Sequence, residues 1–354
     1  MLSILNSLTL IGIQGYQIQV QVDVSNGMPK WEIVGLPDAS IKESKERVKT
    51  AIKNSGYELR SKKILINLAP AEIKKEGSVF DLSIAVGILN SIGYIKNQNI
   101  QEYTFLGELS LDGKVNQIIG ILPMCIELKK LGIKKVILPK SSEIEASIVK
   151  GLEIYGVETL KQTIDFLNKE VKIEKIETNI EEILKNQQEN ELDYQEVKGQ
   201  ENAKRALEIA AAGGHNCILI GSPGSGKTML AKRITTILPD MTFEEALEVT
   251  KIHSIVGLTS QNHIILKRPF RNPHHTASKI ALIGGGKNQK PGEISLAHRG
   301  ILFLDELPEF NKTTLEVLRI PLEDGKVLIS RANQNCEYPA NCMLIASMNP
   351  CPCG

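Results

Sequence analysis

The chain has 354 residues, more than one ordinary hydrophobic core accommodates, so two compact domains are expected. An apolar share of 42% with 23% charged residues is typical of a globular protein and excludes a disordered or membrane-embedded chain. The formal net charge is only +1, so no overall basic field indicates nucleic-acid binding. Any contact with DNA therefore has to be local.

The first residues, MLSILNSLTLIGI, lack the positive flank of a signal peptide, and no apolar run reaches membrane-spanning length. We therefore expect a cytoplasmic protein without a membrane partner. Six cysteines are too few and too unevenly spaced for a secreted disulfide framework, so reduced thiols are expected, with Cys336 at the surface. Cys351 and Cys353 offer two zinc ligands where a tetrahedral site needs four, so zinc is the minor interpretation.

The first part of the chain predicts a mixture of strands and helices. Apolar and polar residues alternate over 17–24, the period of a strand with one buried face. Asp38 then precedes a helical pattern in which Ile41, Val48 and Ile52 share one face, and Gly56 provides a stop. Further patterns predict a strand at 64–68, a helix over 82–92 and a strand at 135–138. An α/β or α+β domain over residues 1–170 follows.

A change in composition separates the two expected domains. Between residues 171 and 192 the chain is rich in Lys, Glu, Asn and Gln, which indicates a charged, partly helical linker. From residue 193 to 354 apolar strands are followed by glycine-rich turns and helices. This order predicts a parallel sheet wrapped by helices, so the fold class is α/β.

A phosphate-binding loop is the clearest motif of the second domain. The strand-like residues 217–220 run into GSPGSGKT and then into a helical pattern from Met229 to Ile234. The glycines let the loop expose amide hydrogens to phosphate oxygens, and the following helix adds its positive N-terminal end. The expected ATP-binding residues are Gly221, Ser222, Pro223, Gly224, Ser225, Gly226, Lys227 and Thr228. Lys227 is expected to reach the β and γ phosphates, and Thr228 to bind Mg²⁺.

Polar residues at the ends of two further strands complete the expected site. The strand-like residues 301–304 end in Asp305 and Glu306, and residues 343–347 lead to Asn349. We expect Asp305 to hold Mg²⁺ through water and Glu306 to orient and deprotonate the attacking water. The amide of Asn349 is expected to sense the γ-phosphate or to hold that water. Glu306, Lys227 and Asn349 are thus the candidate catalytic residues.

Several long segments resemble the ComM/YifB family of magnesium-chelatase-like AAA+ ATPases. In the second domain they are DYQEVKGQENAKRALEIAAAGGHNCILIGSPGSGKTML and PGEISLAHRGILFLDELPEF. In the first domain they are VDVSNGMPKWEIVGLPDASIKESKERVKTAIKNSG, NLAPAEIKKEGSVFDLSIAVGIL and GELSLDGKV. The resemblance implies an α+β domain similar to ribosomal S5 domain 2 and the Lon C-terminal domain, followed by a P-loop AAA+ domain. It also implies a homo-oligomeric ring, expected to be a hexamer.

The resemblance further implies roles for individual residues. Residues 221–228 correspond to Walker A, Asp305 and Glu306 to Walker B, and Asn349 to sensor 1. Adenine contacts are implied for Val197, Gly199 and Gln200. ComM members are implicated in DNA branch migration during natural transformation, as ATP-driven helicases.

A basic insertion between the two Walker motifs is the candidate DNA contact. The segment RPFRNPHHTASKIALIGGG is similar to the inserted hairpins of the family, which point into the ring pore. The residues expected to grip a DNA backbone are Arg268, Arg271, His274, His275 and Lys279. A solvated or subunit-facing loop is the competing interpretation, since a single aromatic residue offers little stacking.

Three other functions compete with a DNA-acting motor. A Lon-type protease would need a nucleophilic serine and an activating lysine where this chain has Val79 and Leu122, although Ser78 lies one residue away. A magnesium-chelatase motor subunit shares the ATP module, but the porphyrin enzyme's small ATPase subunit lacks the first domain. A nucleotide-binding module without turnover is the third. It is suggested because the family's helical lid and trans-acting arginine normally follow sensor 1, whereas Gly354 comes five residues after Asn349. The resemblance therefore implies an AAA+ domain that is incomplete at its C-terminus and lacks its helical lid, and it does not assign Arg319 or Arg331 as the trans-acting arginine.

Overall fold

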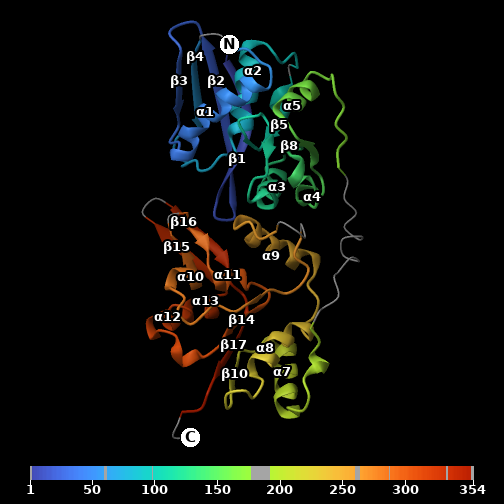
Figure 1. Ribbon diagram of the computed structural model, residues 1–354, viewed down its shortest axis with the longest axis vertical. Coiled ribbons are helices and arrows are strands. Elements are labelled where there is room, and N and C mark those ends of the chain that lie inside the picture. The colour runs from blue at the N-terminus through green and yellow to red at the C-terminus, as the bar shows by residue number, and fades with distance from the viewer. Residues whose placement is uncertain are drawn as a thin grey trace. The chain divides into compact units, whose positions relative to one another are not determined.

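The computed structural model describes residues 2–59, 62–97, 99–176, 192–259, 264–286, 288–331 and 334–351, and Figure 1 shows its elements. The chain divides into two compact units, Met1–Ile180 and Glu181–Gly354. Most of the expected linker, residues 177–191, lies outside the described residues. Within the described part of the chain, no helix has both the length and the apolar character needed to cross a membrane.

The first unit is built on a mixed seven-stranded sheet with the order β3-β4-β2-β1-β5-β8-β9. Strand β2 runs antiparallel to β1 and β4, and the other neighbours run parallel. The strands are β1 (Leu2–Ile11), β2 (Gln14–Ser25), β3 (Lys30–Val34), β4 (Lys63–Ala69), β5 (Tyr103–Phe105), β8 (Lys135–Pro139) and β9 (Glu153–Val157). The short strands β6 (Glu108–Leu109) and β7 (Val115–Asn116) pair separately.

Helices cover this sheet because their apolar faces pack on it. They are α1 (Ala39–Asn54), α2 (Asp81–Ile92), α3 (Ile121–Lys130), α4 (Glu143–Ser147) and α5 (Leu160–Leu167). Helix α2 is buried along most of its length and packs on β1 and β2, and α1 packs on α2. The Asp38 carboxylate caps α1 by accepting a hydrogen bond from the Ile41 amide at 2.8 Å. The cap and the buried face of α1 are thus those that the sequence pattern predicts.

The second unit contains a four-stranded parallel sheet with the order β10-β17-β14-β11. These strands are β10 (Cys217–Ile220), β11 (Phe270–Arg271), β14 (Ile301–Leu304) and β17 (Met343–Met348). Two small antiparallel pairs accompany the sheet. They are β12 (Gly284–Gly285) with β13 (Lys290–Pro291), and β15 (Lys326–Arg331) with β16 (Gln334–Pro339).

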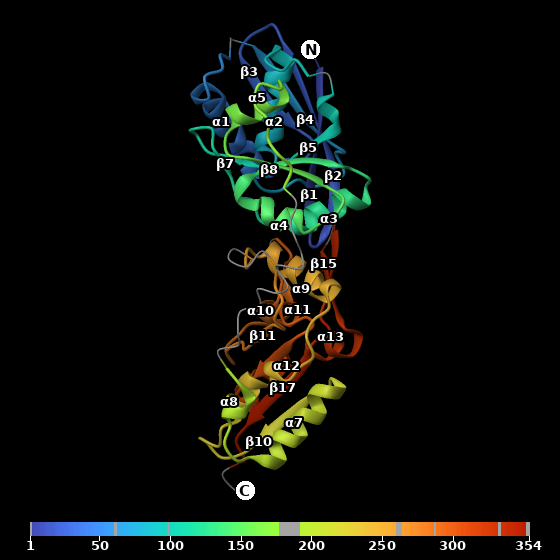
Figure 2. The same cartoon turned by 90° about the vertical axis from the view of Figure 1, so that its right-hand side faces the viewer.

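Seven helices of the second unit are described. They are α7 (Glu201–Gly213), α8 (Lys227–Arg233), α9 (Phe243–Ile255), α10 (Lys279–Ile283), α11 (Glu293–Leu296), α12 (Lys312–Glu316) and α13 (Arg319–Asp324). Helices α7 and α8 lie beside β10 and β17, as Figure 1 and Figure 2 show. Their residues Leu207 and Leu230 share one buried cluster with Phe303 of β14 and Ile345 of β17. This core fixes the glycine loop, which joins β10 to α8, against the sheet.

The parallel core confirms the α/β fold class, while the likeness to ribosomal S5 domain 2 stays a prediction. The strands expected at 217–220 and 301–304 coincide with β10 and β14. The helix expected over 229–234 begins earlier, at Lys227, and ends at Arg233. The surface position expected for Cys336 is wrong. Cys336 is only 3% exposed, because it lies on the same face of β16 as the buried Tyr338.

Candidate functional site

Three chain segments with polar residues meet at one edge of the second unit's sheet. Gly221 directly follows β10, Asp305 follows β14, and Asn349 follows β17. Because these three strands are neighbours and run parallel, their carboxyl ends lie at the same edge. This is the edge where ligands bind in open α/β sheets.

The loop between β10 and α8 depends on glycine. Gly224 and Gly226 have φ angles of +76° and +84°, a left-handed conformation that strains other residues. A Cβ atom on Gly221 would lie 2.9 Å from the Ser225 hydroxyl oxygen. Side chains at these three positions would therefore strain or crowd the loop.

Lys227 lies across the mouth of this loop. Its ammonium donates hydrogen bonds to the carbonyl oxygens of Gly221 at 2.8 Å and Ser222 at 2.9 Å. It also donates to Asn349 Oδ1 at 3.0 Å. All three acceptors are uncharged, so they hold the ammonium in place without neutralising it. The site keeps a positive charge beside the loop, as binding of an anion requires.

Asp305 is held on both of its carboxylate oxygens. The Thr228 hydroxyl donates to Oδ2 at 2.8 Å. Oδ1 accepts from the Ser347 hydroxyl and, at 3.1 Å, from the backbone amide of Glu306. A hydroxyl and a carboxylate that lie together are ligands that suit Mg²⁺, so Thr228 and Asp305 fit the expected metal site.

Glu306 adopts an unusual backbone conformation. Its φ and ψ of 53° and 49° are left-handed, which costs a residue with a side chain about 1 to 2 kcal/mol. Its side chain is 59% exposed, and one carboxylate oxygen lies 3.7 Å from His275 Nδ1. The sharp turn after β14 thus leaves this carboxylate accessible at the edge of the site.

The segment expected to contact adenine is only partly at this site. The Gln200 side chain donates to the carbonyl of Ser225 in the glycine loop at 3.2 Å. Gly199 has a φ of +65°, which turns the chain before α7. Val197 is 5% exposed and belongs to the buried cluster under the sheet. An adenine contact for these residues stays a prediction.

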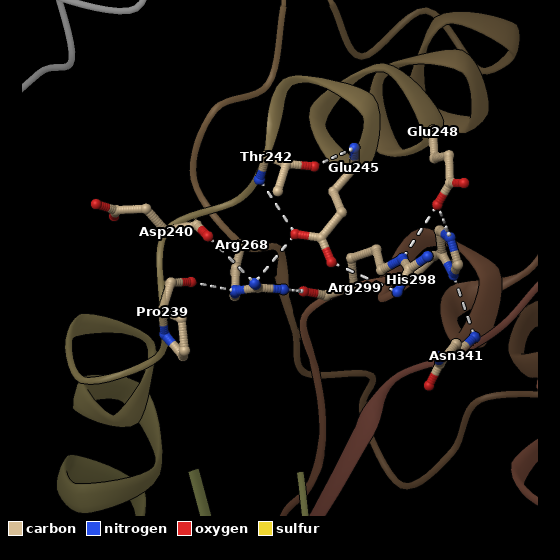
Figure 3. Close-up of polar contacts among 9 residues, drawn as sticks. All are labelled: Pro239, Asp240, Thr242, Glu245, Glu248, Arg268, His298, Arg299 and Asn341. Atoms are coloured by element: carbon tan, nitrogen blue, oxygen red, sulfur yellow. Dashed lines mark hydrogen bonds and ion pairs between the residues drawn. The ribbon is translucent and has the colours of Figure 1, made fainter. Parts of the chain in front are cut away.

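The expected DNA contacts are divided between the two ends of strand β11. Arg268 precedes β11 and donates to the carbonyls of Pro239 at 2.6 Å and Arg299 at 2.7 Å (Figure 3). Since β11 runs parallel to β14, this is the sheet edge opposite the glycine loop. Arg271 makes two hydrogen bonds to Glu293, at 2.6 and 2.8 Å. His275 follows β11 and lies beside Glu306. The two arginines are therefore engaged within the chain.

The other two basic candidates are exposed. The His274 ring lies 4.1 Å from the His275 ring, and its Nδ1 lies 2.9 Å from the Thr276 hydroxyl. Lys279 is exposed at the first residue of α10. Both residues belong, with His275, to the segment after β11, in which His275 lies beside Glu306.

A polar cluster fixes helix α9 to the segments before β11 and β14 (Figure 3). Glu245 contacts Arg268 at 3.3 Å and Arg299 at 3.4 Å. Glu248 contacts Arg299 at 3.0 Å and His298 Nε2 at 3.2 Å. Burial lowers the pKa of His298, although its contact with Glu248 opposes the shift. The neutral ring then accepts a hydrogen bond from the Asn341 amide through Nδ1.

One residue at this edge of the sheet was not predicted from the sequence. Ser347 is buried at 1% exposure and contacts both Asp305 and Glu306. The available signal was a polar residue near the end of the apolar strand MLIASM, beside the strand that carries the acidic pair. Such a residue is also common as a simple strand end, so the signal was weak.

The side chains do not favour the protease interpretation, while the minor zinc interpretation stays a prediction. Val79 and Leu122 are buried apolar residues, and the Ser78 hydroxyl donates to the Glu108 carboxylate. Among the described residues, no group of three or more His, Cys, Asp or Glu side chains is arranged to hold a metal ion. Cys353 lies outside the described residues, while Cys351 is exposed.

Comparison with known proteins finds two family models in this chain. "Magnesium chelatase, subunit ChlI" matches residues 193–354, and "Subunit ChlI of Mg-chelatase" matches residues 20–142. Competence protein ComM of Haemophilus influenzae is 43% identical over the whole chain, which covers 69% of that protein. YifB of Escherichia coli is 44% identical, again over the whole chain and 69% of that protein. Lon protease 2 of Bacillus subtilis is 29% identical over 46% of this chain and 32% of its own length.

Proposed function

Because the chain belongs to the ComM/YifB family of magnesium-chelatase-like proteins, we propose that it is an AAA+ motor that binds ATP with Mg²⁺ and acts on DNA. The observation that carries the proposal is the meeting of Lys227, Thr228 and Asp305 at one sheet edge, beside a glycine-dependent loop. A cation, a hydroxyl and a carboxylate so arranged suit a nucleotide phosphate chain with its metal ion.

Each residue has a distinct role in this proposal. The loop amides and Lys227 contact the phosphates, while Thr228 and Asp305 hold Mg²⁺, which neutralises phosphate charge. Glu306 orients the attacking water and accepts its proton. Asn349 accepts a hydrogen bond from the same Lys227 ammonium that donates to the loop carbonyls. Its amide would lose this contact when the ammonium turns toward a γ-phosphate.

The DNA partner and the ring rest on the family. One relative is named as a competence protein, which accords with action on DNA. We propose that His274, His275 and Lys279 contact the DNA backbone, because His275 lies beside Glu306 and the side chains of His274 and Lys279 are exposed. A homo-oligomeric ring, and a hexamer in particular, is carried over from the family and is tested by light scattering with and without nucleotide.

Removal of the Lys227 ammonium tests nucleotide binding. Lys227→Ala should abolish binding of a fluorescent ATP analogue, because the phosphates lose their main cation, while the circular dichroism spectrum stays unchanged. Lys232→Ala is the matched control, since Lys232 lies exposed on the same helix. Equal affinity of Lys227→Ala and the parent protein would refute the nucleotide site.

Removal of the Glu306 charge separates binding from hydrolysis. Glu306→Gln should bind ATP with the affinity of the parent protein, because only the proton acceptor is lost. It should not hydrolyse the ATP, so no phosphate release should be measured. Glu309→Gln, an exposed neighbour, is the control. Normal hydrolysis by Glu306→Gln would remove this residue from the proposed mechanism.

The same assay decides between the alternatives. A parent protein that binds ATP without measurable turnover would be the nucleotide-binding module, and a motor acting on DNA should hydrolyse ATP faster when DNA is added. The names of the two matching family models favour a magnesium-chelatase motor as the second candidate. Turnover that ignores single-stranded and branched DNA would support that candidate instead.

A further inference from the structure

The buried hydroxyl of Ser347 contacts both acidic residues, Asp305 and Glu306, at the sheet edge that carries the glycine loop. Strands β14 and β17 pair in parallel with Leu304 opposite Ala346, so the next residue of β17, Ser347, lies beside Asp305. The Ser347 hydroxyl donates to Asp305 Oδ1 and accepts from the Glu306 amide at 3.4 Å. With 1% of Ser347 exposed, water cannot replace these contacts.

The simplest explanation of these contacts is that Ser347 has no role beyond hydrogen-bonding its own buried hydroxyl. A buried hydroxyl costs free energy unless it is hydrogen-bonded, and an apolar side chain would avoid this cost. The neighbouring residues of β17, Ile345 and Ala346, are buried and apolar, as the core requires. Ser347 departs from this pattern only where the strand reaches the acidic pair. Its partners, rather than its burial, therefore give it a specific task.

The first partner is the carboxylate of Asp305. Thr228 holds Oδ2 at 2.8 Å, and Ser347 holds Oδ1, so the carboxylate is fixed from two different elements. Without the Ser347 hydroxyl, Oδ1 would keep only the adjacent amide of Glu306. That local contact moves with the chain and cannot fix the carboxylate relative to β17.

The second partner is the backbone of Glu306. Its amide is shared between Asp305 Oδ1 and the Ser347 hydroxyl, and these contacts help hold the left-handed conformation. Because that conformation is intrinsically unfavourable, loss of an acceptor should let the turn relax. The Glu306 carboxylate would then sample other positions.

We propose that Ser347 is a positioning residue of the nucleotide site. Its hydroxyl fixes Asp305 for Mg²⁺ and holds the Glu306 turn, so it sets both the metal dependence of ATP binding and the rate of hydrolysis. This inference rests on the function proposed above. It assigns the residue a role through Asp305 and Glu306, and no direct contact with the nucleotide.

Ser347→Thr and Ser347→Val form a matched pair. Both add similar bulk and suit a strand, but only threonine keeps the hydroxyl. The first readout is amide hydrogen exchange over residues 305–309 in the protein without nucleotide. A lost hydrogen bond contributes about 1 to 1.5 kcal/mol, so exchange should be about fivefold to tenfold faster in Ser347→Val than in Ser347→Thr.

The second readout is the affinity for a fluorescent ATP analogue in Mg²⁺ and in EDTA. Ser347→Thr should keep the gain in affinity that Mg²⁺ gives, and Ser347→Val should lose about fivefold to tenfold of it, with equal affinities in EDTA. Equal exchange and equal Mg²⁺ gain in the two variants would overturn the proposal and leave Ser347 a packing residue. If the parent protein binds no nucleotide, the proposed function fails, and the exchange difference alone decides whether Ser347 holds the turn.

Discussion

Replacement of Arg268 distinguishes an internal structural role from a DNA contact. In Arg268→Gln the shorter, neutral side chain cannot reach the carbonyls of Pro239 and Arg299, which now accept at 2.6 and 2.7 Å. Hydrogen bonds from a charged donor contribute about 1.5 to 3 kcal/mol each. Since 16% of the side chain is exposed, water replaces part of the loss, and we take the lower value for both. We expect the second unit to lose about 3 kcal/mol of stability.

Hydrogen exchange of the protected amides of α9 is a suitable assay, because the single tryptophan, Trp31, reports on the first unit instead. A loss of about 3 kcal/mol speeds this exchange by about a hundredfold. Arg319→Gln is the control, since Arg319 is 79% exposed and its pair with Glu323 should contribute less than about 1 kcal/mol. Unchanged exchange in Arg268→Gln, together with a flatter salt dependence of DNA binding, would refute the internal role.

Three further predictions concern pH, a buried ion pair and DNA. Because burial lowers the pKa of His298, the unfolded chain takes up a proton below about pH 6.5 before the folded protein does, so stability should fall from there as the pH drops. The urea midpoint should show this, with a smaller fall in His298→Gln; equal falls would contradict it. In the first unit, Arg47 Nε lies 2.9 Å from Oδ2 of the fully buried Asp81. Arg47→Met removes this ion pair and should cost the first unit about 3 kcal/mol of stability, followed by Trp31 fluorescence; no loss would contradict the pairing. Lys279→Gln should weaken DNA binding and reduce its salt slope by about one, whereas an unaltered slope excludes a phosphate contact.

Patterns that depend on local chemistry were predictable from the sequence. The alternation over 17–24 became β2, because the sheet buries one side of each strand. Asp38 became the cap of α1, since an aspartate before a helix satisfies a free amide. The glycine loop was equally predictable, because all the residues that form it are consecutive in the sequence. The sequence also indicated the acidic pair, as it directly follows a buried strand.

Features that depend on partners distant in the sequence were not predictable. Arg268 was predicted to contact DNA because it lies in a basic segment. In the folded chain it meets carbonyls at positions 239 and 299, about thirty residues away on either side. The hydroxyl of Ser347 likewise meets the acidic pair forty-odd residues earlier, through the pairing of β14 with β17. No local pattern records either contact.

The two residues of strand β11 separate the basic segment into two groups with different positions. The basic segment from Arg268 to Lys279 reads as one patch in the sequence, yet Phe270 and Arg271 pair with the start of β14 and carry the chain across the sheet. The residues before the strand therefore fix α9 at one edge, and those after it reach Glu306 at the other. DNA bound to the second group would lie beside the proposed catalytic carboxylate, whereas the first group could influence ATP turnover only through the stability of the sheet. Variants of Arg268 should then lower activity in proportion to the loss of folded protein, while variants of Lys279 should lower DNA stimulation in a fully folded one.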